Sequence, residues 1–131
     1  MSPTETFKLF AAAINFHDVK SLTALMSADH VFVDGLGNRS EGAATMQAGW
    51  RGYFEMCPDY WIRTDHVATD ADAVLAVGEA GGTIDGISWH TPAAWKAVIR
   101  DGNVIEWRVF ADNKPVFDIL GRRNNTPNSE G

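Results

Sequence analysis

The chain has 131 residues, which is enough for one domain with a single core, and 45% of them are hydrophobic. Its 11 basic and 17 acidic side chains give a formal net charge of −6, which argues against nucleic acid and anionic membranes as partners. No apolar run is long enough to cross a bilayer, the N-terminal sequence lacks a signal pattern, and the single Cys57 has no disulfide partner. These features predict a cytoplasmic protein.

Helical spacing characterises the first part of the chain. Apolar residues at i, i+3, i+4 and i+7 predict a helix over residues 3–16. Asp18 is the expected N-cap of a second short helix that extends to Met26. A brief strand over residues 30–33 is expected to lead into a loop that starts at Asp34. A third helix is predicted to end before Pro58.

From residue 60 onward the hydrophobic period changes to two. Strands are predicted over residues 60–68, 73–83, 87–100 and 103–112, with tight turns at Asp85-Gly86 and Asp101-Gly102. Short turns make neighbouring strands pair antiparallel, so a meander is expected. Gly81-Gly82 indicates a bulge or a sharp bend. After Pro115 a short apolar turn is expected before a polar tail.

Helices followed by a long curved sheet predict an α+β fold. We expect a cone-shaped antiparallel sheet, made of the four-strand meander plus a short strand, wrapped around three N-terminal helices. The expected domain covers residues 1–121, and residues 122–131 are the expected flexible tail. A cone that is incompletely filled leaves a pocket.

The order of these elements resembles the NTF2-like superfamily, and within it the SnoaL-like and ketosteroid-isomerase-like group. The resemblance rests on Asn15-Phe-His-Asp18, on the strand that ends at Asp34, and on the final hairpin DGNVIEWRVFADNKP, residues 101–115. It covers the chain to about Gly121. It implies the fold, whereas the reaction differs among members of the superfamily.

The resemblance implies a role for Asp34, which matches the carboxylate that shuttles a proton in ketosteroid isomerases. The tyrosine of those enzymes is matched by Phe10, and their second oxyanion donor falls near Ala94 or Trp95, so steroid isomerisation by that mechanism is not expected. SnoaL-type cyclases place an acid/base aspartate on the last strand, where Asp112 is the candidate. Similar epoxide hydrolases need an aspartate where this chain has Val109.

Each candidate for catalysis also has a structural interpretation. Asp34 is either a general base or the cap of the turn that follows it. Asp112 is either a second acid or a residue that bonds the backbone where the strand ends, and alternation leaves open which face of this strand looks inward. His90 is either a proton relay or a half-exposed strand residue.

The aromatic side chains are candidates for a ligand pocket or for core packing. Those expected to bind ligand are Phe10, Trp50, Tyr53, Phe54, Trp61, Trp89, Trp95 and Trp107. No zinc spacing and no phosphate-binding glycine loop is present in the sequence, so neither a metal nor another cofactor is expected.

These observations favour a homodimeric small-molecule pocket protein with a small hydrophobic or aromatic ligand. If it is an enzyme, it is expected to catalyse cofactor-independent isomerisation, cyclisation or dehydration of a hydrophobic carbonyl compound. The alternative is a non-catalytic ligand-binding or dimerisation module of the same fold.

Overall fold

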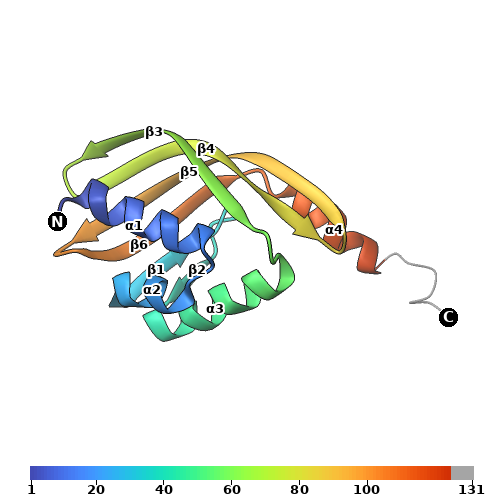
Figure 1. Cartoon of the computed structure of the whole chain (residues 1–131), viewed down its shortest axis with the longest axis horizontal. Helices are drawn as coiled ribbons and strands as arrows, with labels where there is room; N and C mark the ends of the chain where they lie inside the picture. The colour runs from blue at the N-terminus through green and yellow to red at the C-terminus, as the bar shows by residue number, and fades with distance from the viewer. Residues whose placement is uncertain (125–131) are drawn as a thin grey trace.

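The computed structural model describes residues 1–124 and contains four helices and one curved six-stranded sheet (Figure 1). Among these residues no helix is long and apolar enough to cross a membrane. The elements, in chain order, are α1 (Pro3–Asn15), α2 (Val19–Leu25), β1 (Met26–Val33), β2 (Arg39–Glu41), α3 (Ala43–Met56), β3 (Trp61–Asp70), β4 (Ala73–Ile84), β5 (Ile87–Arg100), β6 (Asn103–Ala111) and α4 (Lys114–Asn124).

The sheet has the strand order β2-β1-β6-β5-β4-β3. The antiparallel meander β3 to β6 is confirmed, and Asp101 and Gly102 both have positive φ, as the tight final turn requires. Strand β1 pairs with β6 in parallel and with β2 antiparallel. The α+β prediction is therefore confirmed, and the helices α1 to α3 cover the concave face (Figure 1).

The main differences from the sequence-based expectation concern Met26 and the strand β2, while other boundaries shift by one or two residues. Met26 was expected in the second helix, but that helix ends at Leu25 and Met26 begins β1, where its partner on β6 is Val104. Pairing with a strand distant in sequence overrides the local helical spacing. The short β2 was not predicted because its sequence, Arg-Ser-Glu, has no strand signal.

Of the bulge or sharp bend expected at Gly81-Gly82, the bulge is wrong. The pairing of β4 with both neighbours continues through Gly81 without a register shift. These glycines instead allow close approach, because a Cβ on Gly81 would lie 2.6 Å from the Trp61 ring and one on Gly82 would lie 2.4 Å from the Cys57 sulfur.

The Asn15-Phe-His-Asp18 segment fastens the end of α1 to the sheet. The Asn15 side chain donates to the Ile62 carbonyl (3.0 Å) and accepts from the Ile62 N–H (2.8 Å). His17 contacts the Tyr60 carbonyl through Nε2 at 2.7 Å and stacks on Phe54. Asp18 caps α2, as predicted, by accepting from Ser21.

The end of the described chain forms a helix rather than the expected short turn. Helix α4 includes residues 122–124 of the stretch expected as a tail, and residues 125–131 lie outside the described residues.

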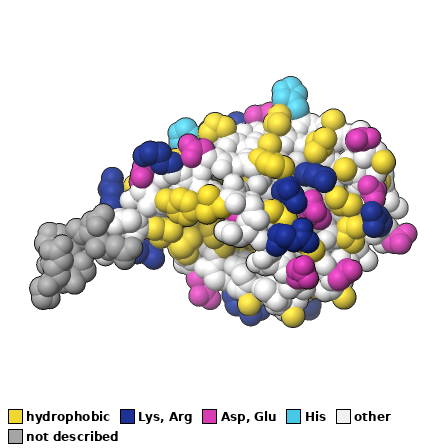
Figure 2. Space-filling model, turned by 180° about the vertical axis from the view of Figure 1, so that it is seen from behind, with side chains coloured by type: hydrophobic (Ala, Val, Ile, Leu, Met, Phe, Trp, Pro, Cys, Tyr) yellow, Lys and Arg dark blue, Asp and Glu magenta, His cyan; other side chains and the backbone are white. Residues whose placement is uncertain are grey.

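Seen from behind the view of Figure 1, hydrophobic side chains form separate groups with charged side chains between them (Figure 2).

Candidate functional site

A cavity of about 440 Å³ lies between the concave face of the sheet, α3 and α4. Its walls are mostly apolar, and four elements contribute most of them: α3, the neighbouring strands β5 and β6, and α4. Its aromatic lining consists of Phe32, Trp50, Tyr53, Tyr60, Trp89 and Phe117. A concave apolar site with few polar groups is typical of small-molecule binding.

Helical and strand periodicity explain why these side chains converge. Trp50 and Tyr53 are three residues apart on α3 and therefore lie on one helix face. Trp89 and Thr91 are buried and face the cavity, because β5 buries its odd-numbered residues.

Two half-buried tyrosines, Tyr53 and Tyr60, are among the polar residues that line the cavity. Burial raises the pKa of Tyr53 and of Tyr60 well above the ordinary value, so both hydroxyls keep their protons. Their rings meet edge to face with centroids 4.9 Å apart, and Tyr60 also stacks near Trp89. Within residues 1–124 neither hydroxyl has a hydrogen-bond partner, so both can donate to a ligand.

Asp34 is the only charged side chain among the described residues that line the cavity. Its Oδ1 accepts from the N–H groups of Leu36 and Asn38, both at 2.9 Å, and its Oδ2 accepts from the Asn38 amide at 3.2 Å. The carboxylate therefore caps its own turn, in a residue that lines the cavity. These bonds hold it in one orientation and leave acceptor capacity on Oδ2.

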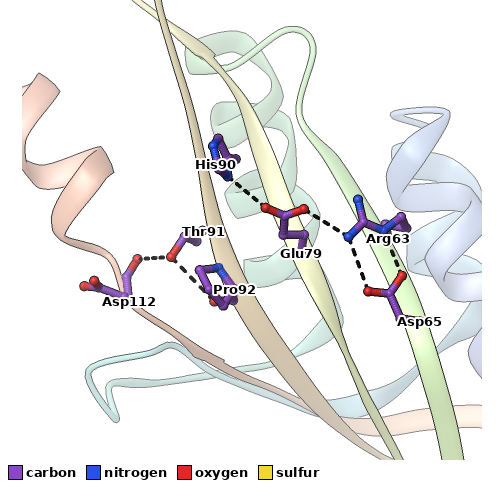
Figure 3. A network of polar contacts seen from close by, with 7 residues as sticks. All are labelled: Arg63, Asp65, Glu79, His90, Thr91, Pro92 and Asp112. Carbon is purple, nitrogen blue, oxygen red and sulfur yellow. Dashed lines mark hydrogen bonds and ion pairs between the residues drawn. The ribbon is translucent and has the colours of Figure 1, made fainter.

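Asp112 is placed on the other side of the last strand. Val109 and Ala111 line the cavity, and Asn113 continues this alternation, whereas Asp112 is exposed. The Asp112 carboxylate accepts from the Lys114 N–H, and its backbone carbonyl accepts from the Thr91 hydroxyl at 2.9 Å (Figure 3). The structure therefore places Asn113, not Asp112, beside the cavity.

His90 lies on the outer face of the sheet, away from the cavity. Its Nδ1 lies 2.8 Å from Glu79, which also pairs with Arg63 at 3.0 Å, and Arg63 bonds Asp65 (Figure 3). Hydrogen bonds from His90 and from Arg63 lower the pKa of the Glu79 carboxyl. The network joins β3, β4 and β5 at the surface.

The candidate aromatic residues divide into two groups. Trp50, Tyr53 and Trp89 line the cavity. The others do not: four are buried in the core and one lies on the outer face. The core residues are Phe10, Phe54, Trp95 and Trp107, and the outer residue is Trp61.

The positions matched to the two oxyanion donors of ketosteroid isomerases lie outside the cavity, unlike Asp34. Phe10 packs against Trp107 with ring centroids 4.7 Å apart, and Trp95 is buried in the same core. Ala94 is on the opposite face of its strand from Trp95. Any oxyanion donors in this cavity therefore come from other positions, and the phenols of Tyr53 and Tyr60 are available there.

Many residues that line the cavity are not among the sequence-based candidates, and two of them, Tyr60 and Asn113, are polar residues that a sequence signal could have identified. The sequence places Tyr60 at the start of a strand, and an aromatic residue two positions after Pro58 is the signal that could have identified it. Asn113 shares the alternation of Val109 and Ala111, which could have identified it once the inward face was known. Across residues 1–124 no three His, Cys, Asp or Glu side chains are grouped as metal ligands.

Comparison with known proteins identifies the family. Residues 7–113 match the model of the SnoaL-like domain, whereas no curated protein matches the sequence. Solved structures with the same fold include a protein from Catenulispora acidiphila DSM 44928 with a ketosteroid isomerase-like fold in complex with trimethylamine. It is 20% identical over 90% of this chain and 92% of its own, with a TM-score of 0.80.

Two further structures are similarly close in fold. An LEH-like epoxide hydrolase from M. tuberculosis is 18% identical, with 92% of this chain and 90% of its own covered and a TM-score of 0.79. An NTF2-like protein of unknown function from Cytophaga hutchinsonii ATCC 33406 is 13% identical, with 89% and 96% covered and a TM-score of 0.72. The chain belongs to the SnoaL-like domain family of the NTF2-like superfamily.

Proposed function

We propose that the cavity binds a hydrophobic small molecule that carries a carbonyl oxygen. The observation that carries this proposal is the pair of neutral, unpartnered phenols of Tyr53 and Tyr60 in an otherwise apolar cavity of about 440 Å³. Aromatic walls suit a flat ligand. A ligand oxygen that accepts from these hydroxyls would be fixed in orientation, since a buried acceptor must be hydrogen-bonded.

Proton transfer by Asp34 is the chemistry that we propose for this site. Asp34 would take a proton from the carbon next to the carbonyl, and the electron pair would move to the carbonyl oxygen. Tyr53 and Tyr60 would stabilise the charge that develops there. Such a step begins isomerisation, aldol-type cyclisation or dehydration, and it requires no cofactor.

A non-catalytic binding module is the second candidate. Three donors already form hydrogen bonds with the Asp34 carboxylate, and all three belong to the turn that it caps. A structural role therefore accounts for these hydrogen bonds without catalysis. In this case the ligand would bind without losing a proton. Both candidates predict the same affinity for the ligand, but only the first predicts that the bound ligand loses a proton.

A neutral aromatic ketone, 2-acetylnaphthalene, tests both candidates. Binding is measured by quenching of tryptophan fluorescence, and Tyr53→Phe and Tyr60→Phe are each expected to weaken it about two- to tenfold. Exchange of the ketone methyl protons in D₂O is followed by NMR. Asp34→Asn is expected to slow the catalysed exchange by about 10²- to 10⁴-fold and to preserve binding.

Matched controls use the two candidates that face away from the cavity. Asp112→Asn and His90→Gln are expected to leave exchange unchanged. Binding without exchange in the wild-type protein would favour the non-catalytic module. Failure of the ketone to bind at all would contradict the proposed function.

We also propose that a second copy of the chain covers the outer face of the sheet. Val77, Ala94 and Phe110 are register neighbours on three adjacent strands, and Leu75 lies in the next row. The exposed fractions of Leu75, Val77 and Phe110 are 45%, 49% and 52%. Such a row is typical of a protein interface.

Light scattering after size exclusion tests the dimer. Phe110→Lys is expected to give a monomer, while the control Phe16→Lys changes an exposed phenylalanine at the end of α1 and is expected to leave the dimer intact. A wild-type monomer at all concentrations would contradict this proposal.

A further inference from the structure

We propose that α4 is a lid that controls access to the cavity and that the Arg123–Asp85 ion pair is its latch. This inference concerns the regulation of the site described above and rests on the proposed binding function. Separate observations support the opening of the cavity beside α4, the weak attachment of α4 to the core, and the ion pair.

Helix α4 forms one wall of the cavity. Val116, Phe117 and Leu120 line the cavity, and Ile119 is also buried. Two residues that line the cavity are also exposed to solvent. The exposed fraction is 48% for Phe117 and 64% for Leu36, which lies in the loop after β1. The cavity therefore reaches the surface between this loop and α4, and outward movement of α4 would widen the opening.

The attachment of α4 is separate from the main core. The main cluster of buried residues lies between the sheet and helices α1 to α3 and contains no residue of α4. Val116 and Ile119 belong to a small second cluster with Cys57, Ile84 and Trp89. Figure 1 shows α4 at the end of the sheet, away from α1 and α2. Helix α4 can therefore detach at little cost to the main core.

One bidentate ion pair ties the far end of α4 to the sheet. Arg123 donates from Nε to Asp85 Oδ2 at 2.5 Å and from Nη2 to Oδ1 at 2.7 Å. Asp85 lies in the turn between β4 and β5, with a φ of +53°, which asparagine also tolerates. Asp85→Asn thus removes the charge of the latch without changing the turn.

A second ion pair in α4 provides the matched control. Lys114 Nζ bonds Asp118 at 2.7 Å, four residues along the same helix, and this pair does not tie α4 to the sheet. Asp118→Asn therefore also removes one carboxylate that pairs with a cation of α4, and it leaves the latch in place.

Hydrogen exchange without ligand measures opening of the lid. In the wild-type protein the α4 amides are expected to exchange faster than those of β5. Asp85→Asn is expected to accelerate exchange in α4 about two- to fivefold, with β5 unchanged, as the loss of an exposed ion pair allows. Asp118→Asn, although it can loosen the helix itself, is expected to have a smaller effect than Asp85→Asn.

Stopped-flow fluorescence with 2-acetylnaphthalene measures gating. Asp85→Asn is expected to raise the association and dissociation rates by the same two- to fivefold factor and to leave Kd within twofold, since a lid affects both directions. Added salt is expected to raise the wild-type rates and not those of the variant, because salt screens the latch.

The outcomes separate this inference from the proposed function. Ketone binding with rates that are equal in the wild-type protein and Asp85→Asn would overturn the lid and leave the binding function standing. Absence of ketone binding would overturn the binding function and the gate together. Equal effects of Asp85→Asn and Asp118→Asn would show that the loss of either ion pair of α4, not the loss of its tie to the sheet, changes the rates, and would overturn the proposal.

Discussion

His30 is expected to make the protein lose stability as the pH falls below about 6.5. Its side chain is fully buried on β1, Nδ1–H donates to the Val104 carbonyl at 2.6 Å, and Nε2 is buried without a partner among the described residues. Burial lowers the pKa of this imidazole below its ordinary value. The native state therefore keeps His30 neutral, while the unfolded state binds a proton at mildly acidic pH.

The size of this effect follows from the linkage of proton binding to folding. One proton bound only by the unfolded state changes the free energy of unfolding by about 1.4 kcal/mol per pH unit. For a histidine that stays neutral in the native state, the loss between pH 7.5 and 5.5 amounts to about 1.4 kcal/mol, because the unfolded side chain titrates near 6.5. The loss stops growing below the folded-state pKa.

Urea unfolding of the wild-type protein and His30→Gln at these two pH values isolates the contribution. Glutamine retains a donor for the Val104 carbonyl and cannot take up a proton in this range. The wild-type protein is expected to lose more stability than the variant on acidification, and the carboxylates contribute equally to both. Equal losses in the two proteins would refute the assignment of a depressed pKa to His30.

Three other predictions concern the cavity and the core. Tyr53 and Tyr60 are expected to show no tyrosinate absorbance in the folded protein at pH 10–11, and stability is expected to fall above about pH 10, because the unfolded phenols release their protons there. Gly82→Ala is expected to cost about 1–3 kcal/mol in urea unfolding because its Cβ would meet a thiol, while Gly52→Ala in open space on α3 is expected to stabilise by about 0.5–1 kcal/mol. Trp107→Ala is expected to cost about 3–5 kcal/mol by the same assay, and a cost below 1 kcal/mol would contradict its place in the core.

Local signals were sufficient for most of the fold. The Asp101-Gly102 turn and the period of two defined the meander, and Asp18 marked the start of α2, because turn and cap chemistry depends on a few adjacent residues. Met26 was misplaced and β2 was missed because each is determined by pairing with a strand that the local sequence does not identify.

The site was less predictable than the fold. Composition shows that the chain is rich in aromatic residues, but it does not show which of them face the cavity. Trp107 and Trp50 cannot be distinguished in the sequence, although Trp107 is in the core and Trp50 lines the cavity. Alternation along β6 predicted that Asp112 and Val109 face opposite ways. Only the packing of the sheet against α3 shows that the side of Val109 faces inward.

The parallel pairing of β1 with β6 has a consequence for synthesis of the chain on the ribosome. His30 and Val104, which bond each other across this pair, are 74 residues apart. Helices α1 and α2 and strand β1 therefore emerge long before the strand that completes their core. The nascent N-terminal segment must remain without its native partner until β6 has left the ribosome, which makes folding slow and dependent on the C-terminal half.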